Sequence, residues 1–379
     1  MTDPRVERLA ELLVGYSLGV RAGQLVRIDG SSEAEPLIVA AHRAALRRGA
    51  HVYAQVSLDG LAELHVDRAT DEQLTHVSPA ERAEMERLDA LLTIWSESNT
   101  RSFTRAEPDR QGRYIAARRE LSSIRGERMA RGEMTWCGTL YPTEAHAQDA
   151  EMSLREYEDF VYRACHVADG EDPAAHWKAA ASDLEARARE LSMVRELRIV
   201  GPDTDLRLVV EGRTWLAAKG ERNMPDGEVF TSPVEKGTEG TIRYALPAIF
   251  NGREVEDVRL RFEGGRVTAA EASHGGEYLS ALLDMDGGSR ILGEVAFGLN
   301  YEIDRFTRNI LFDEKIGGTM HLALGSAFKS AGGENVSGLH WDMICDLRAD
   351  GEVYADGELV WRAGAFTTPA PGSTRSDAR

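Results

Sequence analysis

Cysteine is scarce in this chain, and long apolar runs are missing. Its three cysteines, Cys137, Cys165 and Cys345, are odd in number and widely spaced, which argues against a disulfide framework or a zinc knot and indicates reduced thiols. No apolar run approaches the ~20 residues that span a bilayer. The first residues carry early acids and lack the apolar segment of a secretory signal. We therefore expect a cytoplasmic protein with no membrane partner.

An excess of basic residues is also absent. The formal net charge is -18, and a nucleic-acid binder normally presents a basic face, so the charge argues against nucleic acid as a partner. Glycine-rich phosphate loops are missing as well. Residues 29–32 (DGSS) follow a predicted strand, but they contain neither the three-glycine fingerprint nor a Gly-Lys-Ser/Thr loop. The composition fits an enzyme that gathers negative charge around a cation site.

The first half of the chain alternates strand and helix patterns. Strands at residues 24–28 and 51–56 flank an apolar helix at 36–46, which Ser32 and Glu35 precede at capping-box spacing. This is a βαβ unit, and it implies a parallel sheet. The same domain receives a strand at 91–95, a charged helix at 109–131, a helix that Ser153 and Glu156 open, and a connector helix at 172–194. We predict an α/β domain over residues 1–194.

The second half changes to strands with one buried face. Apolar and polar residues alternate at 197–200, 206–210, 241–244 and 258–263, the period of a half-buried strand. Asn251-Gly252 and Gly264-Gly265 are hairpin-turn signals. We predict a β-rich α+β domain over residues 195–366 that carries a metal site, followed by a disordered tail at 367–379.

Imidazoles and carboxylates concentrate in this second domain. His340 and Asp342 are two residues apart, so on a strand both side chains point to one face and reach one ion. His321, Glu294 and Glu228 are further candidates. Neutral imidazole together with hard carboxylate oxygen suits Zn, Co, Mn or Fe. A buried Glu with His is also a common ion pair, so each pair alone carries little weight.

Several long motifs in one order make the chain similar to a known family. They are residues 141–145 (YPTEA), 152–160 (MSLREYEDF), 223–233 (NMPDGEVFTSP), 292–294 (LGE), 309–315 (NILFDEK), 318–325 (GTMHLALG) and 340–344 (HWDMI). Together they resemble the thermophilic-type metalloaminopeptidases, the family of aminopeptidases T and S. The resemblance runs through most of the chain, and it is far more specific than a single His-x-Asp.

The resemblance implies a homodimer that removes N-terminal residues from peptides with a free N-terminus, using two divalent metal ions per chain. Zn or Co is implied, with Mn or Fe possible. Carried over by position, the metal ligands are Glu228, Glu294, His321, His340 and Asp342. Glu294 is the candidate bridging carboxylate. A bridging water would be acidified from a pKa of about 15.7 towards about 7, and Glu314 is the candidate that moves its proton to the leaving amine.

One position departs from the family pattern. Seven residues after the first metal histidine, where the family has a catalytic tyrosine, this chain has Phe328. A phenyl ring cannot donate a hydrogen bond to the oxyanion, and losing one such donor costs about a hundred- to a thousand-fold in rate. Tyr278, Tyr301 or Tyr354 are candidates to supply the missing hydroxyl from another strand.

Two other functions remain open at this stage. His321, His340 and Asp342 alone form a two-histidine, one-carboxylate set, the arrangement of mononuclear non-haem iron oxygenases; distant relatives of the family include a ring-cleaving dioxygenase of pyridine catabolism. The second alternative is a metal-binding homologue whose hydrolysis is weakened by Phe328. Residues 142–144 are interpreted as a plain turn in preference to a substrate-cleft loop, and His146 and His274 match no ligand position.

Overall fold

The computed structural model describes residues 3–168, 170 and 172–368. The chain divides into two compact units, Met1–Ala174 with Gly220–Pro225 and Ala175–Lys219 with Asp226–Arg379. The domain ranges 1–194 and 195–366 stay a prediction, but helix α10 (Pro173–Leu191) differs from the expected grouping. Its apolar residues Leu184, Ala188 and Leu191 belong to the hydrophobic core of the C-terminal unit. Of the expected tail, residues 369–379 lie outside the described part of the chain.

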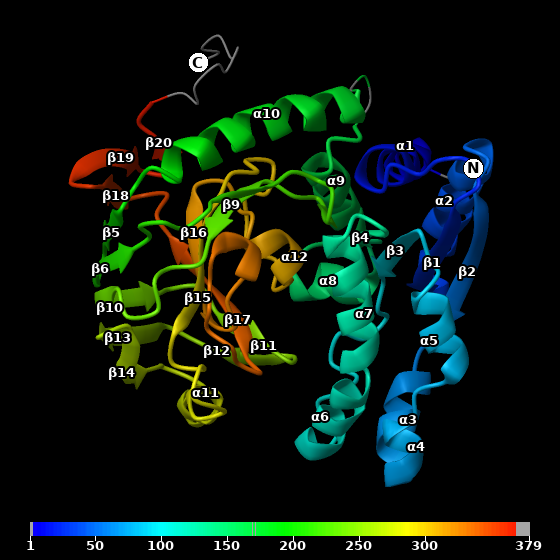
Figure 1. Cartoon of the computed structure of the whole chain (residues 1–379), viewed down its shortest axis with the longest axis horizontal. Helices are drawn as coiled ribbons and strands as arrows, with labels where there is room; N and C mark the ends of the chain where they lie inside the picture. Colours follow the sequence, from blue (N-terminus) through cyan, green and yellow to red (C-terminus); the bar gives the residue numbers. More distant parts are fainter. Residues whose placement is uncertain (1–2, 169, 171, 369–379) are drawn as a thin grey trace. The chain divides into compact units, whose positions relative to one another are not determined.

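The N-terminal unit is built on a parallel five-stranded sheet, which confirms the predicted α/β class. The strand order is β2 (His51–Ser57), β1 (Leu25–Ser31), β3 (Ala90–Trp95), β4 (Thr135–Leu140) and β8 (Asn223–Met224), and every neighbouring pair runs parallel. Strands β2, β1 and β3 lie side by side in Figure 1. Helix α2 (Glu35–Arg47) connects β1 to β2 and completes the expected βαβ unit.

The helices of this unit differ from the prediction where the sequence carries short local signals. The single helix expected at 109–131 is two helices, α6 (Pro108–Ala117) and α7 (Arg119–Ala130). The capping box at Ser32 is wrong, because Ser31 instead caps a 3-10 turn at Ser32–Ala34; the box at Ser153 is confirmed. The other helices are α1 (Pro4–Leu12, continued by a π turn at Leu13–Ser17), α3 (Leu61–Arg68), α4 (Asp71–Thr75), α5 (Pro79–Met85), α8 (Glu144–Asp149) and α9 (Leu154–Ala164).

The C-terminal unit contains a large antiparallel sheet. Its order is β14 (Arg266–Glu271), β13 (Val258–Glu263), β10 (Thr238–Tyr244), β6 (Thr204–Val209), β5 (Glu196–Gly201), β18 (Glu352–Ala355), β19 (Glu358–Arg362) and β20 (Ala365–Phe366). Gly264 and Gly265 join β13 to β14 with φ of 58° and 81°, the backbone that a two-residue hairpin turn demands. Asn251 and Gly252 do the same between β11 (Ala248–Phe250) and β12 (Arg253–Val255). Both predicted hairpins are confirmed.

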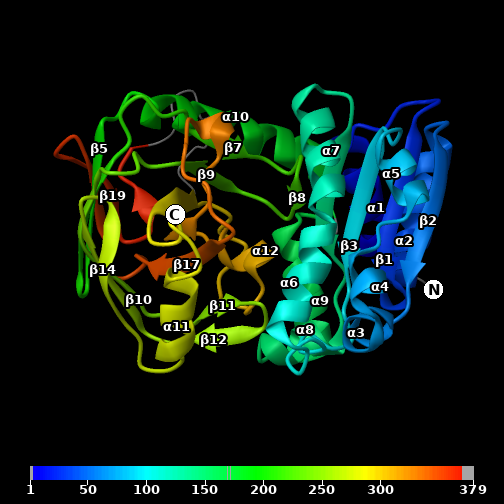
Figure 2. The same ribbon diagram turned by 60° about the horizontal axis from the view of Figure 1, so that its bottom comes forward.

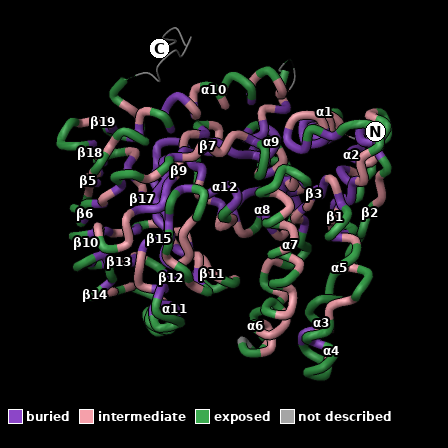
Figure 3. Tube along the Cα trace, in the orientation of Figure 1, coloured by how far each residue is buried: buried purple, intermediate pink, exposed green. Residues whose placement is uncertain are grey.

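A second antiparallel sheet carries the candidate site. Its order is β17 (His340–Asp346), β16 (Thr319–Gly325), β15 (Leu292–Gly298), β9 (Glu228–Thr231) and β7 (Leu216–Ala218), all in the C-terminal unit of Figure 2. Every residue of β15 and β16 is buried, as the purple tube of Figure 3 shows. Val295, Leu322 and Trp341 point from one face into a hydrophobic cluster shared with the large sheet. Trp341, between the candidate ligands His340 and Asp342 in sequence, therefore packs in the core.

Short helices α11 (Gly276–Leu283) and α12 (Ile310–Asp313) complete the C-terminal unit. Across the described residues, no helix has both the length and the apolar character that a membrane crossing requires.

Candidate metal centre

The antiparallel sheet β17-β16-β15-β9-β7 has one face toward the core and one face away from it. On the face away from the core, acidic or imidazole side chains alternate with very small residues. Antiparallel pairing places Ala296 beside His321, Gly298 beside Glu228, Ala323 beside Asp342 and Gly325 beside His340. Alanine and glycine leave space above the sheet where a larger side chain would fill it. The five predicted ligand side chains therefore share one face with room between them.

Glu294 reaches this face because of a β-bulge. Leu292 pairs with Leu324 and Glu294 pairs with Ala323, so Gly293 is an extra residue in β15. In a regular strand, Glu294 would point to the same face as Leu292, into the core. The bulge reverses that alternation, so that Leu292 and Val295 both join the core while Glu294 faces the site. A Cβ on Gly293 would lie 2.2 Å from the Ser326 carbonyl oxygen, so this position requires glycine.

Both histidines are held by the backbone through Nδ1. His321 Nδ1 lies 2.8 Å from the Glu314 carbonyl oxygen, and His340 Nδ1 lies 2.9 Å from the Ser326 carbonyl oxygen. A carbonyl oxygen only accepts, so each Nδ1 must donate. Nε2 is therefore the nitrogen turned toward the carboxylates. Fixing the ring in this way is how proteins orient metal-binding histidines.

The carboxylates converge on the two Nε2 atoms. Glu294 Oε1 lies 3.5 Å from His321 Nε2, while Glu294 Oε2 lies 3.2 Å from His340 Nε2. Asp342 Oδ1 lies 3.9 Å and 3.6 Å from the same two nitrogens. Glu228 Oε2 lies 3.7 Å from His321 Nε2. One carboxylate, Glu294, thus faces a different histidine with each of its oxygens.

These donors fit a cation better than they fit one another. Among the described residues, Glu228 Oε2 and Asp342 Oδ1 are buried atoms with no hydrogen-bond partner. Burial raises the pKa of Glu228 well above its usual range and the pKa of Asp342 to about 6, the expected result when negative charge lacks a counter-ion. Two groups of three residues could each hold one ion, because one donor atom from each member lies within 4.8 Å of the other two. The groups are Glu294 with His340 and Asp342, and Glu314 with His321 and Asp342.

Metal binding to this cluster must displace protons. Burial alone would lower the pKa of His321 and of His340, but the nearby Glu294 and Asp342 carboxylates raise both to about 10. Burial alone would raise the pKa of Glu294, yet hydrogen bonds from the two rings lower it to about 2. Without metal, both rings therefore carry a proton at neutral pH, whereas a metal ligand must be neutral.

We accordingly expect at least two protons to be released per chain when two ions bind between pH 7 and pH 9, one from each imidazole and any that Glu228 holds in addition. The overall constant for binding both ions should then fall at least about 100-fold for each pH unit lost. Both imidazole pKa values lie above the unfolded value of about 6.5. This protonation therefore stabilises the metal-free protein fully below pH 6.5, and that stabilisation is lost as pH rises toward 10. Calorimetry in buffers of different ionisation enthalpy measures the release, and a proton-neutral titration would contradict it.

Glu314 brings two neighbours that the sequence analysis did not single out. Its Oε1 forms an ion pair with Nζ of Lys315, a side chain that is 0% exposed. Burial alone would lower the pKa of Lys315, but the charges of Glu314, Glu228 and Asp226 raise it above its ordinary value. Asp226 is itself buried. Lys315 directly follows Glu314, and Asp226 lies two residues before Glu228. Their place beside candidate site residues in the same motifs is the signal in the sequence that could have indicated them.

Phe328, the position at which the resemblance implies a tyrosine, lies beside the candidate ligand His340. Its ring packs edge-on against His340 with centroids 5.3 Å apart, and against Phe230 at 5.2 Å. The three tyrosines considered as substitutes bond elsewhere. Tyr278 donates to the Phe250 carbonyl, Tyr301 to the Gly364 carbonyl and Tyr354 to Glu352.

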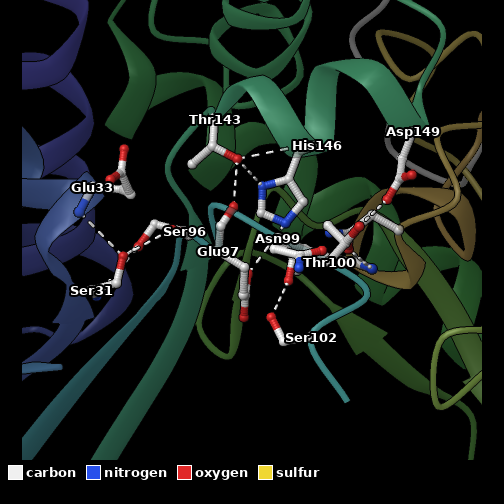
Figure 4. Close-up of polar contacts among 12 residues, drawn as sticks. Ser31, Glu33, Ser96, Glu97, Asn99, Thr100, Ser102, Thr143, His146 and Asp149 are labelled. Carbon is white, nitrogen blue, oxygen red and sulfur yellow. Dashed lines mark hydrogen bonds and ion pairs between the residues drawn. The ribbon is translucent and has the colours of Figure 1, made fainter. Parts of the chain in front are cut away.

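Residues 142–144 form the start of a helix in the N-terminal unit, so the predicted plain turn is wrong. Thr143 is the N-cap of helix α8, and Glu144 is its first residue. Thr143 donates its hydroxyl to the Glu97 carbonyl oxygen, and the ring of His146 lies against both Thr143 and Glu97 (Figure 4). His146 Nε2 is 3.2 Å from Glu97 Oε2. This network ties the end of β4 to the end of β3.

Two imidazoles and three carboxylates on one face of a sheet, with the Glu314 carboxylate beside them, define a candidate metalloenzyme whose site lies in the C-terminal unit. The family model described as thermophilic metalloprotease (M29) matches residues 2–366. The chain belongs to this family, which confirms the resemblance seen in its motifs.

Relatives and solved structures agree with this membership. The chain is 29% identical to aminopeptidase 2 of Geobacillus stearothermophilus over 96% of this chain and 97% of that protein. It is 30% identical to aminopeptidase T of Thermus thermophilus over 88% and 86%. The structure of wild-type AmpT from Thermus thermophilus matches with a TM-score of 0.83 at 26% identity, covering 96% and 99%. A 2,5-dihydroxypyridine dioxygenase from Pseudomonas putida KT2440 matches with a TM-score of 0.62 at 16% identity, covering 98% of each chain, a likeness of fold alone.

Proposed function

We propose that this chain is a metal-dependent aminopeptidase that hydrolyses N-terminal residues from peptides at a centre of two divalent cations. One observation carries the proposal: the two oxygens of Glu294 face two different backbone-anchored histidines. A carboxylate in that position suits bridging between two ions. The activity is proposed because relatives that align along most of their length are named aminopeptidases.

Each side chain has a role in this proposal. Glu228 and His321 would hold one ion, His340 and Asp342 the other, and Glu294 both. When bound, Zn or Co supplies Lewis-acid chemistry that acidifies water and polarises a carbonyl. Glu314, whose side chain is 18% exposed, would accept the proton of the attacking water and return it to the leaving amine. Carboxylate oxygens near the ions would anchor the free α-ammonium group of the substrate.

The oxygenase alternative needs only His321, His340 and Asp342. Glu228 lies beside His321, Glu294 lies beside both histidines, and both carboxylates are buried. Two more carboxylates exceed the two-histidine, one-carboxylate set. The donor set therefore favours two hydrolytic ions over one iron.

Metal analysis combined with a chromogenic aminoacyl substrate tests the proposed function. We expect two Zn or Co ions per chain, hydrolysis that a chelator removes, and recovery on adding either metal. One iron per chain with oxygen-dependent turnover would support the oxygenase instead. Two bound ions without hydrolysis of any aminoacyl substrate would leave a metal-binding homologue.

Phe328→Tyr tests the missing hydroxyl. The new phenol would stand beside His340, since the phenyl ring already packs there. We expect kcat to rise at least about ten-fold, less than the hundred- to thousand-fold cost of removing a native donor. Phe230→Tyr adds a hydroxyl to the neighbouring ring and serves as the control. Equal turnover for Phe328→Tyr and the unmodified protein would show that another group already fills this role.

The cytoplasmic location and the homodimer are proposals of the same kind. Cys137, Cys165 and Cys345 are buried thiols, which agrees with a reducing compartment. The dimer rests on the family resemblance, and light scattering of the purified protein tests it.

A further inference from the structure

Lys315 is a buried cation to which the proposed function assigns no role. Its side chain is 0% exposed, and lysine is almost never fully buried unless it is paired. Its partner is Glu314, the preceding residue and the candidate proton carrier. The side chains of Glu314 and Lys315 are therefore both directed into the protein, next to the candidate ligands His321 and Asp342.

The backbone around Lys315 is fixed to the sheet that carries the site. Its carbonyl oxygen accepts from the Asn300 backbone N–H at 3.2 Å, and the Glu314 carbonyl is the group that His321 Nδ1 faces. A Cβ on Gly298 would lie 2.3 Å from the Ile316 carbonyl oxygen and 3.1 Å from the carbonyl carbon of Lys315. Glycine at 298 thus allows residues 315 and 316 to lie directly on β15, which fixes the backbone from which the ammonium extends.

Lys315 lies among the negative charges of the candidate site. The carboxylates of Glu314, Glu228 and Asp226 all act on its ammonium group, and Glu228 and Glu314 belong to the cluster of candidate ligands. Removing the ammonium would leave these carboxylates repelling one another in the protein interior, which is costly. Divalent cations at the candidate ligands would offset part of that repulsion.

We propose that Lys315 is a positioning residue: its buried ammonium holds the Glu314 carboxylate toward the candidate ligands and offsets part of the negative charge gathered there. This inference rests on the proposed function. Lys315 acts through Glu314 and touches neither substrate nor reacting atoms.

A double-variant cycle separates this role from simple packing. Lys315→Met keeps the length of the side chain and removes its charge, and Glu314→Gln removes the partner charge. We expect Lys315→Met to lower kcat about 10- to 100-fold, the usual effect of losing an outer partner of a metal site, with KM little changed. In the Glu314→Gln background, Lys315→Met should have no further effect on kcat. Losses that multiply would overturn the proposal.

Metal content and thermal stability supply readouts that do not depend on turnover. Lys315→Met should still bind two ions per chain, and its melting temperature should fall more in the chelated protein than in the loaded one, since the ions offset part of the repulsion. The double variant should restore the melting temperature of the chelated protein. If Lys315→Met does not fold, a folded double variant with two ions supports the proposal, and an unfolded one overturns it.

Lys329→Met, at an exposed lysine, is the matched control and should change neither measurement. The failure of this inference is distinguishable from the failure of the proposed function. An unmodified protein that neither binds metal nor hydrolyses aminoacyl substrates would refute the function. An active unmodified protein with multiplying losses would refute only the role of Lys315.

Discussion

We expect His340→Ala to abolish metal-dependent aminoacyl hydrolysis and to leave the fold intact. The imidazole is 33% exposed and lies at the first residue of β17, so its removal opens no cavity in the core. It does remove the only candidate nitrogen donor on the Glu294 Oε2 side of the site among the described residues. We expect turnover below detection, at most one tightly held ion per chain, and an unchanged circular dichroism spectrum.

His274→Ala is the matched control for this variant. His274 is exposed and pairs through its backbone with Glu256, and no ligand position coincides with it. It should keep full activity and both ions. Undiminished turnover in His340→Ala would refute the ligand assignment, whatever the metal content.

Glu314→Gln separates a proton carrier from a metal ligand. Glutamine has nearly the same shape and can still accept a hydrogen bond from Lys315, but it cannot take up a proton. Positioned acid–base groups contribute about 10²–10⁴-fold to rate, so we expect kcat to fall within that range while two ions per chain remain bound. Steady-state kinetics and elemental analysis on the same samples measure both quantities.

A loss of one ion in Glu314→Gln would make Glu314 a ligand. The set of Glu314, His321 and Asp342 within 4.8 Å makes this outcome a definite alternative. Glu302→Gln, which changes a partly exposed acid of the same unit, serves as the control.

The sequence was sufficient for the fold class because long periodic segments dominate both halves. The βαβ unit around α2 and the hairpin turns at Asn251 and Gly264 follow from local rules, and the structure has them. Helices α3, α4 and α5 were missed because each is too short to show a period. The sequence could not show that α10 packs on the C-terminal unit, because an amphipathic pattern indicates a buried face but not which hydrophobic core buries it.

The five ligand positions were predicted from motifs, whereas their convergence depends on contacts between distant strands. Only the structure shows that Glu294 faces one histidine with each oxygen. Lys315 was overlooked because lysine in a charged motif is normally solvent-exposed, and its burial depends on Gly298 allowing residues 315 and 316 to approach β15.

The extra residue at Gly293 has a consequence for anyone who transplants this centre. If the two histidines and three carboxylates were copied onto a regular antiparallel sheet, the carboxylate equivalent to Glu294 would point into the hydrophobic core of the recipient protein. The β-bulge must therefore be copied together with the side chains, because the inserted glycine determines which face of the sheet Glu294 occupies.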